Sequence, residues 1–280
     1  MTSTSGRTLG GKSLDRNLEA IIIFASIALG LSVVYWLIFY LSQKGAIRFA
    51  PDRSTWGAAR AYGPTAAAVI SALYVGGLSS LKRLWMRVTA WKVPWWLYAL
   101  ALLGFPVAVL GVTYATAVFG TAPVRWAGHV PCIFSCSFFT SVIDGPLGEE
   151  IGWRGFLLPG LLTKMSAVQA SLIVGLIGWL WHLPLYQADG RNLTLLFLTR
   201  YLVIEVGYSL IWTWFFIRSG YSALIPIIVH TACNYSFLLQ MRIVFPAVHV
   251  PEIYFVLLIA IVAAVAAINL KRYSARPSGI

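Results

Sequence analysis

Two adjacent glutamates and an arginine stand in the middle of an otherwise apolar chain, in the stretch GEEIGWRGFLLP at 148–159. On a helix, Glu150 and Arg154 are one turn apart, so the arginine can hold Glu150 in an ion pair. Glu149 points about 100° away around the helix and lacks that partner. A carboxylate left unpaired in an apolar setting accepts a proton readily, which suits a general base. The motif therefore predicts one structural carboxylate and one reactive carboxylate.

Two further polar patterns lie inside apolar runs, namely WLWHLP around His182 and HTACN at 230–234. His230 and Asn234 are one helical turn apart, so an imidazole and an amide share one face and can donate hydrogen bonds to a developing oxyanion. His182 precedes Pro184, and a free imidazole at a helix end can assist proton transfer. Because polar groups are expensive to bury in a membrane, all three patterns are candidate functional sites.

The composition identifies an integral membrane protein. The chain has 280 residues, of which 59% are hydrophobic and only 11% are charged, whereas about a quarter of a soluble domain is charged. The net charge is +12, and the Lys and Arg residues fall mostly between the apolar runs, where they meet anionic headgroups. The expected partner is the lipid bilayer and not a nucleic acid. The cysteines, Cys132, Cys136 and Cys233, lie in apolar segments and predict no disulfide framework.

Apolar runs near the length of a membrane span, about 20 residues, recur along the chain. They predict an all-α fold, a polytopic transmembrane helix bundle of about eight spans. The predicted spans are Leu18–Leu41, Tyr62–Leu78, Trp96–Phe119, Val130–Ile143, Ala167–Leu185, Leu193–Ile217, Ala223–Leu239 and Ile253–Leu270. The stretch 81–96 mixes four Lys and Arg residues with four tryptophans, which predicts an interfacial amphipathic segment on the membrane surface.

We expect a single transmembrane helical domain at 20–272, between a polar N-terminal tail at 1–19 and a short C-terminal tail at 273–280. The first apolar run follows basic residues, as in a signal peptide, but it is longer than a signal core and no cleavage site follows it. It is therefore expected to be a retained anchor. Eight spans place both termini on the same side of the membrane. The segments on that side carry more Lys and Arg than the segments on the other side, which predicts that both termini are cytoplasmic.

The three polar patterns resemble the motifs of the CAAX protease and bacteriocin-processing family of intramembrane endopeptidases, also called the Abi family. GEEIGWRGFLLP resembles its EExxxR motif, WLWHLP its middle His motif and HTACN its HxxxN motif, in the same order. The resemblance covers a motif core at about 97–235. The middle motif is often FxxxH, whereas this chain has Gly178 four residues before His182. An aromatic ring is still expected at this place, with Trp179 adjacent to the glycine.

The resemblance implies a glutamate-dependent peptidase that needs no cofactor and no metal. It implies that Glu149 activates a water molecule with the assistance of His182. It also implies that His230 and Asn234 stabilise the tetrahedral oxyanion. The expected substrate is a peptide or protein, and a prokaryotic cell membrane is the expected location.

The same resemblance gives Glu150 and Arg154 the role of organising the site and helping to hold the substrate. Eukaryotic members of the family remove the last three residues from prenylated CAAX proteins. Prokaryotic members have further substrates, including bacteriocin-linked and immunity roles. The resemblance therefore implies that the bond to be cleaved lies near the C-terminus of a prenylated protein or in another membrane-associated protein.

Two other classes of function stay open. A zinc-dependent membrane hydrolase could use Glu149, His182 and His230 as ligands, because two histidines and a glutamate form an established catalytic zinc shell. A non-catalytic membrane immunity or partner-binding protein would use the same groups only as an ion pair and as interhelical hydrogen bonds. Sensitivity to a chelator would support the first alternative, and an unchanged biological activity of Glu149→Gln would support the second.

Other polar residues in the spans are expected to be structural. Glu205 can pair with Arg200 or approach the site, and the structural interpretation is preferred. Cys233 is expected to serve packing. Ser222 and His230 are eight residues apart on one predicted helix, a rise of about 12 Å, so they are not expected to form a catalytic dyad.

Overall fold

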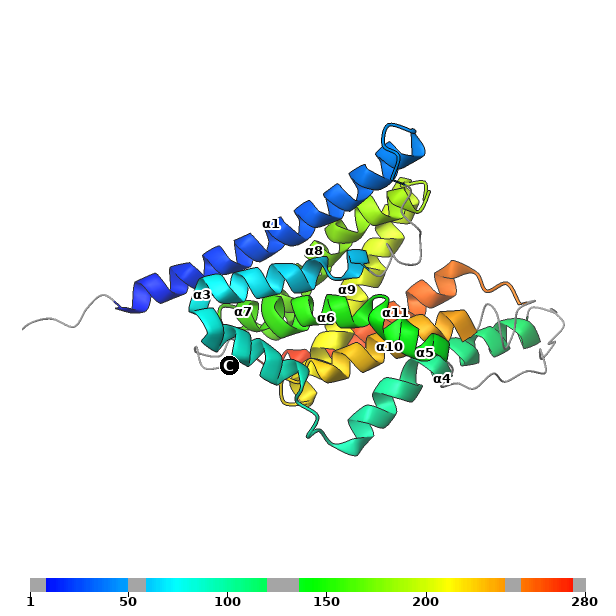
Figure 1. Ribbon diagram of the computed structural model, residues 1–280. Coiled ribbons are helices and arrows are strands. Elements are labelled where there is room, and N and C mark those ends of the chain that lie inside the picture. Colours follow the sequence, from blue (N-terminus) through cyan, green and yellow to red (C-terminus); the bar gives the residue numbers. More distant parts are fainter. Residues whose placement is uncertain (1–8, 50–58, 120–135, 240–247, 274–280) are drawn as a thin grey trace, which may run out of the picture.

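The computed structural model describes residues 9–49, 59–119, 136–239 and 248–273, and within these ranges the regular structure is helical (Figure 1). The all-α prediction is therefore confirmed. The helices are α1 (Leu9–Gln43), α3 (Gly63–Val88), α4 (Trp95–Phe119), α5 (Cys136–Ile143), α6 (Pro146–Gly152), the π-helical turn η1 (Trp153–Leu157), α7 (Leu158–Leu162), α8 (Ala167–Ala188), α9 (Leu195–Arg218), α10 (Leu224–Leu239) and α11 (Glu252–Leu270).

Within the described ranges, six helices are long and apolar enough to cross a membrane: Arg16–Gln43, Ala59–Val88, Trp95–Phe119, Ala167–Ala188, Leu195–Arg218 and Glu252–Leu270. They correspond to six of the eight predicted spans, and the chain is a multi-pass integral membrane protein. The seventh predicted run forms α10, a shorter apolar helix of 16 residues. Only 136–143 of the fourth run is described, so the rest of that predicted span and Cys132 lie outside the described residues.

Helix α1 begins at Leu9, inside the segment predicted to be a polar tail. Extending an existing helix costs much less free energy than nucleating one. Lys, Leu and Arg are also good helix formers, so they prolong the spanning helix beyond its apolar part. Residues 1–8 and 274–280 of the two predicted tails lie outside the described residues.

Helix α3 changes direction at a Gly76–Gly77 pair (Figure 1). Gly77 has φ 58° and ψ −144°, a backbone conformation that side chains with a Cβ rarely adopt. Beyond this kink the chain carries the tryptophans of the predicted interfacial segment, and Trp85, Trp91 and Trp95 are 65%, 66% and 79% exposed. Exposed tryptophans beside cations suit a membrane–water interface.

The acidic motif lies at the centre of the bundle, because its short helices are enclosed by the long ones (Figure 1). Helix α1 packs against α3 and α8, and α9 packs against α8, α10 and α11. Helix α6 contacts α3 on one side and α10 on another, and η1 also contacts α3. The two glutamates of α6 are therefore held between two long helices.

Two glycines let α6 approach the start of α3 closely. A Cβ added to Gly148 would lie 2.7 Å from the Ala61 carbonyl oxygen, and one added to Gly152 would lie 2.6 Å from the Pro64 carbonyl carbon. The Thr65 hydroxyl donates a hydrogen bond to the Gly148 carbonyl across the same contact. Since the two glycines flank Glu149 and Glu150, this contact fixes where the carboxylates lie.

Replacing Gly152 with alanine is expected to lower the free energy of unfolding by about 1–3 kcal/mol, because the methyl group overlaps backbone atoms that cannot rotate away. Thermal unfolding of the purified protein in detergent measures this effect. The matched control is Gly111→Ala in α4, where an added Cβ meets no neighbouring atom within 4 Å. Equal melting temperatures for the two variants would contradict the close contact.

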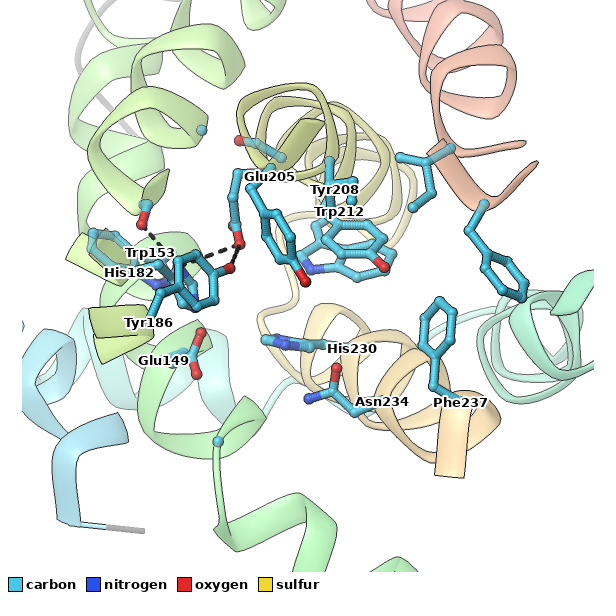
Figure 2. Close-up of a pocket in the computed structure, with 18 of the residues that line it drawn as sticks. Glu149, Trp153, His182, Tyr186, Glu205, Tyr208, Trp212, His230, Asn234 and Phe237 are labelled. Atoms are coloured by element: carbon cyan, nitrogen blue, oxygen red, sulfur yellow. Dashed lines mark hydrogen bonds and ion pairs between the residues drawn. The ribbon is translucent and has the colours of Figure 1, made fainter. Parts of the chain in front are cut away.

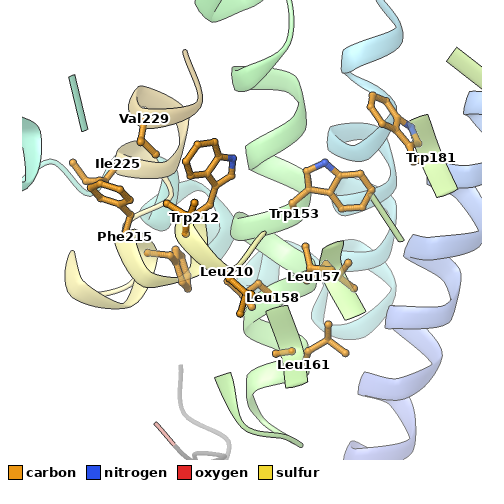
Figure 3. Packing of buried hydrophobic residues seen from close by; sticks show 14 of the residues in the cluster. Trp153, Leu157, Leu158, Leu161, Trp181, Leu210, Trp212, Phe215, Ile225 and Val229 are labelled. Atoms are coloured by element: carbon orange, nitrogen blue, oxygen red, sulfur yellow. The ribbon is translucent and has the colours of Figure 1, made fainter. Parts of the chain in front are cut away.

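The segment that follows the motif is anchored in the largest hydrophobic core (Figure 3). Leu157 and Leu158 are fully buried, and Trp153 is 3% exposed. The Trp153 ring makes edge contacts with Phe24 of α1 at 5.4 Å and with Trp181 of α8 at 6.0 Å between centroids. Burial of large side chains at this density makes the motif a rigid part of the bundle.

Candidate active site

A cavity of about 730 Å³ lies between α6, α8, α9, α10 and α11 (Figure 2). The six residues predicted for the site all line it: Glu149, Glu150, Arg154, His182, His230 and Asn234. They come from four elements, α6, η1, α8 and α10. The fold therefore brings together groups that are up to 85 positions apart in the sequence.

Glu150 has partners on two elements. Its side chain is 1% exposed, and Arg154 Nη1 lies 3.0 Å from Oε2 and 3.1 Å from Oε1. His230 Nδ1 lies 2.9 Å from the same Oε1. The predicted pair with Arg154 is confirmed. The contact with His230 was not predicted, because helical periodicity says nothing about residues 80 positions apart.

A π-helical turn carries Arg154 directly after α6. Such turns often occur at functional sites, where they change the direction of side chains within a helix. One carbonyl of this turn, that of Gly155, accepts a hydrogen bond from Arg87 Nη1 at 3.0 Å. The interfacial part of α3 is thus tied to the arginine of the motif.

Glu149 has a different environment from its neighbour. Its carboxylate lies in the space between His182 and His230 (Figure 2). A Cβ added to Gly145 would lie 3.5 Å from Glu149 Oε1 and 4.0 Å from Asn234 Nδ2, so these two groups flank the same glycine. Within the described ranges, the Glu149 carboxylate makes no hydrogen bond or ion pair with a side chain. It is therefore available to a water or substrate in the cavity.

His182 is oriented through its Nδ1 atom. This nitrogen lies 2.9 Å from the Gly178 carbonyl oxygen and 3.4 Å from Glu205 Oε1. A nitrogen that faces two acceptors carries the hydrogen, so Nε2 is the acceptor in the neutral ring. Tyr186, one turn further along α8, stacks on the imidazole with centroids 5.4 Å apart and planes inclined by 18°.

His230 and Asn234 lie one turn apart on α10 and line the cavity together, as predicted (Figure 2). His230 Nδ1 faces Glu150, so Nε2 is the ring nitrogen that can interact with a substrate. The His230 ring also packs on Trp212, with centroids 5.9 Å apart. The Asn234 amide is exposed to the cavity, where it can donate hydrogen bonds.

Comparison with known proteins finds a related family and a related protein. Residues 131–236 match the family described as type II CAAX prenyl endopeptidase Rce1-like. The comparisons support the CAAX protease and bacteriocin-processing family. A curated relative, CAAX prenyl protease 2 of Methanococcus maripaludis, is 29% identical over 92 residues, which is 31% of this chain and 34% of the relative. The match thus spans about a third of the length of that relative.

Gly178 stands where the FxxxH motif of the CAAX protease and bacteriocin-processing family has an aromatic residue, and the structure shows which ring lies beside His182 instead. Trp179 does not line the cavity in the described part of the chain, whereas Gly178 does. The aromatic ring against His182 comes from Tyr186 on the next turn. The expected aromatic ring is therefore present beside His182, but it belongs to Tyr186 and not to Trp179, because neighbouring residues on a helix point about 100° apart.

Glu205 lines the cavity, although the sequence indicated no preference for a place in the site. Its predicted alternative partner, Arg200, instead binds Glu252 at 3.1 Å, and Glu205 lines the cavity. A signal was present in the sequence: Arg200 is five residues from Glu205, about 140° around the helix, so the two do not share a face. Of the two predicted placements, pairing with Arg200 is not found, whereas approach to the site is confirmed by the contact of Glu205 with His182.

Two other polar residues have hydrogen-bond partners in the structure. Cys233 is buried, and its thiol donates to the Tyr208 hydroxyl at 3.3 Å, as expected of a packing residue. The Ser222 hydroxyl donates to the Ala90 carbonyl at 2.7 Å and forms no dyad with His230. Among the side chains that the structure describes, no three His, Cys, Asp or Glu residues are grouped so as to hold a metal ion.

The cavity lies toward one end of the bundle. Its lining includes Tyr186 and Phe237, near the ends of α8 and α10, and Tyr201 and Glu252, near the starts of α9 and α11. Because Glu252 is among the exposed residues of the lining, the mouth is at this end.

The two ends of the described chain lie at the opposite end of the bundle (Figure 1). The Ala167 amide at the start of α8 donates to the Tyr273 carbonyl, which follows α11, at 3.1 Å. A Cβ added to Gly160, just before α8, would lie 3.4 Å from Ile21 in the early part of α1. Helix α11 has 19 residues and is about 28 Å long, so the full height of a spanning helix separates the mouth from Tyr273.

Proposed function

We propose that the protein is an intramembrane endopeptidase that hydrolyses a peptide bond with a water molecule activated by Glu149. The observation that carries this proposal is the unequal environment of two adjacent carboxylates. Glu150 is buried and held by Arg154 and His230, whereas Glu149 faces the cavity and has no hydrogen-bond or ion-pair partner among the described side chains. Two carboxylates in different environments can perform different tasks at one site.

In the proposed reaction, Glu149 takes a proton from water as the oxygen attacks the carbonyl carbon of the peptide bond. The carbonyl oxygen becomes an oxyanion, which accepts hydrogen bonds from the Asn234 amide and from Nε2 of a protonated His230. Glu150 neutralises the charge of that imidazolium. The proton is then delivered to the leaving amine with the assistance of His182, as the carbon–nitrogen bond breaks.

The proposed substrate is a segment of a membrane-associated protein, and prenylated C-terminal CAAX peptides are the first class to test. The match to a type II CAAX prenyl endopeptidase family supports this choice. We further propose a prokaryotic cell membrane with both termini on the cytoplasmic side. The excess of Lys and Arg in the segments beside the termini supports this orientation.

Asn234→Ala is expected to lower kcat by about 10²- to 10³-fold with a small change in KM, because the amide acts mainly on the oxyanion. Cleavage kinetics in liposomes measure the effect. Ser236→Ala is the matched control on the same helix, since the Ser236 hydroxyl bonds only the Ala232 carbonyl of its own helix. A rise in KM at constant kcat would instead assign Asn234 to substrate binding.

The experiment that tests the function is cleavage of peptides by the purified full chain in liposomes, with and without a strong chelator. The peptide set contains farnesylated CAAX peptides and the same sequences without the lipid. Cleavage that a chelator does not affect supports the proposal. Cleavage that is lost to the chelator and restored by zinc contradicts the glutamate mechanism, and cleavage by Glu149→Gln at the wild-type rate rejects Glu149 as the base.

A further inference from the structure

Glu205 is a carboxylate inside a membrane-spanning helix that the proposed reaction does not use. It lies on α9, its side chain is 16% exposed, and it lines the cavity. An ionisable group at this depth is expensive, so it is retained only where it has a partner or a task. Arg200 of the same helix is engaged by Glu252, so the contacts that Glu205 makes elsewhere must account for it.

One oxygen of Glu205 binds two side chains of the neighbouring helix. Oε1 accepts a hydrogen bond from the Tyr186 hydroxyl at 3.1 Å and lies 3.4 Å from His182 Nδ1 (Figure 2). Tyr186 and His182 are one turn apart on α8 and stack on each other. These three residues form a single unit, which we call the His182 cluster.

The cluster sets which nitrogen of His182 faces the reaction. The Gly178 carbonyl lies 2.9 Å from Nδ1 and already holds the hydrogen on that atom, so Nε2 is left as the proton acceptor. The carboxylate of Glu205 adds what a carbonyl cannot, namely a full negative charge. When Nε2 accepts a proton, the ring becomes a cation, and an adjacent carboxylate stabilises that cation and its orientation.

The absence of a side chain at position 178 leaves room for this arrangement. A Cβ added to Gly178 would lie 3.9 Å from Glu205 Oε2, an ordinary contact distance. A methyl group therefore fits beside the carboxylate.

We infer that Glu205 is a positioning residue that acts through His182, orienting its ring and stabilising its protonated form during proton transfer. This inference rests on the proposed peptidase function. It assigns a task to the one carboxylate of α9 and explains why Tyr186 occupies its place on α8.

The first test is Glu205→Gln, which keeps the shape of the side chain and removes its charge. The variant is expected to lower kcat by about 10- to 100-fold, as loss of an outer partner of a catalytic group does, with an unchanged KM and melting temperature. The matched control is Glu19→Gln. Glu19 accepts a hydrogen bond from the Tyr74 hydroxyl at 2.6 Å on helices outside the cavity, and the control is expected to cleave at the wild-type rate. A wild-type kcat for Glu205→Gln would overturn the inference.

A double-variant cycle separates positioning from a general structural role. If Glu205 acts through His182, Glu205→Gln lowers kcat by less than about twofold when it is added to His182→Gln. A purely structural carboxylate would lower kcat by the same factor in both backgrounds, and that additive result would contradict the inference. Should Glu205→Gln fold poorly, Tyr186→Phe replaces it in the cycle, because it removes the hydroxyl donor and keeps the stacked ring.

A spectroscopic readout distinguishes failure of this inference from failure of the proposed function. The chain has only four histidines, so the ¹⁵N resonances of the His182 ring can be assigned by their loss in His182→Gln. We expect these resonances to move in Glu205→Gln and to stay in place in Glu19→Gln. Unchanged His182 resonances in Glu205→Gln would contradict the contact between Glu205 and His182, even if the protein cleaves peptides. Shifted resonances would support this contact, even if no tested peptide is cleaved.

Discussion

Replacing Glu149 with glutamine is expected to lower the rate of peptide cleavage by about 10²- to 10⁴-fold, the range that a general base contributes. The amide keeps the size of the side chain but cannot take a proton from water. Among the residues that the structure describes, no side chain forms a hydrogen bond or ion pair with this carboxylate, so the variant is expected to fold and to melt like the wild type. Single-turnover cleavage in liposomes tests the expected loss of rate, and a thermal unfolding curve tests the expected stability.

The neighbouring variant Glu150→Gln is the natural contrast. Glu150 is fully buried between Arg154 and His230, so loss of its charge is expected to lower stability together with activity. An identical pattern for the two glutamine variants, in which both melt normally or both unfold, would show that their environments do not differ as described.

Arg154→Ala is expected to lower the free energy of unfolding by about 3–5 kcal/mol, because it leaves the Glu150 carboxylate buried without its strongest partner. The guanidinium is 5% exposed and the carboxylate 1%, so water cannot replace the lost interaction. Unfolding by denaturant in mixed micelles measures the loss. Activity is expected to fall in parallel, because His230 is oriented by the same carboxylate.

A surface ion pair provides the control for this magnitude. Arg200 and Glu252 are 3.1 Å apart, with side chains 32% and 46% exposed, and removal of such a pair costs about 0–1 kcal/mol. Arg200→Ala is therefore expected to melt close to the wild type. Replacing both members of the buried pair, as Glu150→Gln with Arg154→Met, is expected to recover part of the stability lost by Arg154→Ala. Without any recovery, the buried pair would not be the origin of the destabilisation.

Features that depend on neighbouring residues in the chain could be predicted from the sequence. Hydrophobic runs located six spanning helices, and the spacing of four residues predicted both the Glu150–Arg154 pair and the shared face of His230 and Asn234. The same spacing also predicted that Glu149 and Glu150 have different environments, because only Glu150 faces Arg154. These predictions succeed because a helix fixes the relative direction of residues within about two turns.

Features that depend on contacts between distant segments could not be predicted in this way. The bond between Glu150 and His230 and the contact of His182 with Glu205 join residues on different helices. The π-helical turn after α6 was likewise not predicted, whereas the stacking of Tyr186 on His182, four residues away on α8, follows the same spacing rule as the predicted pairs. No periodicity in a single chain encodes which faces of two helices meet.

If the chain cleaves peptides as proposed, the separation of the cavity mouth from the two ends of the described chain would make that cleavage vectorial. A reporter fused near either terminus marks one end of the bundle, and the cavity opens near the other (Figure 1). In sealed vesicles of mixed orientation, a membrane-impermeant substrate would be consumed only by those molecules whose terminal tags are shielded from external protease. The arrangement of α8 and α11 thus places the cavity mouth and the ends of the described chain at opposite ends of the bundle.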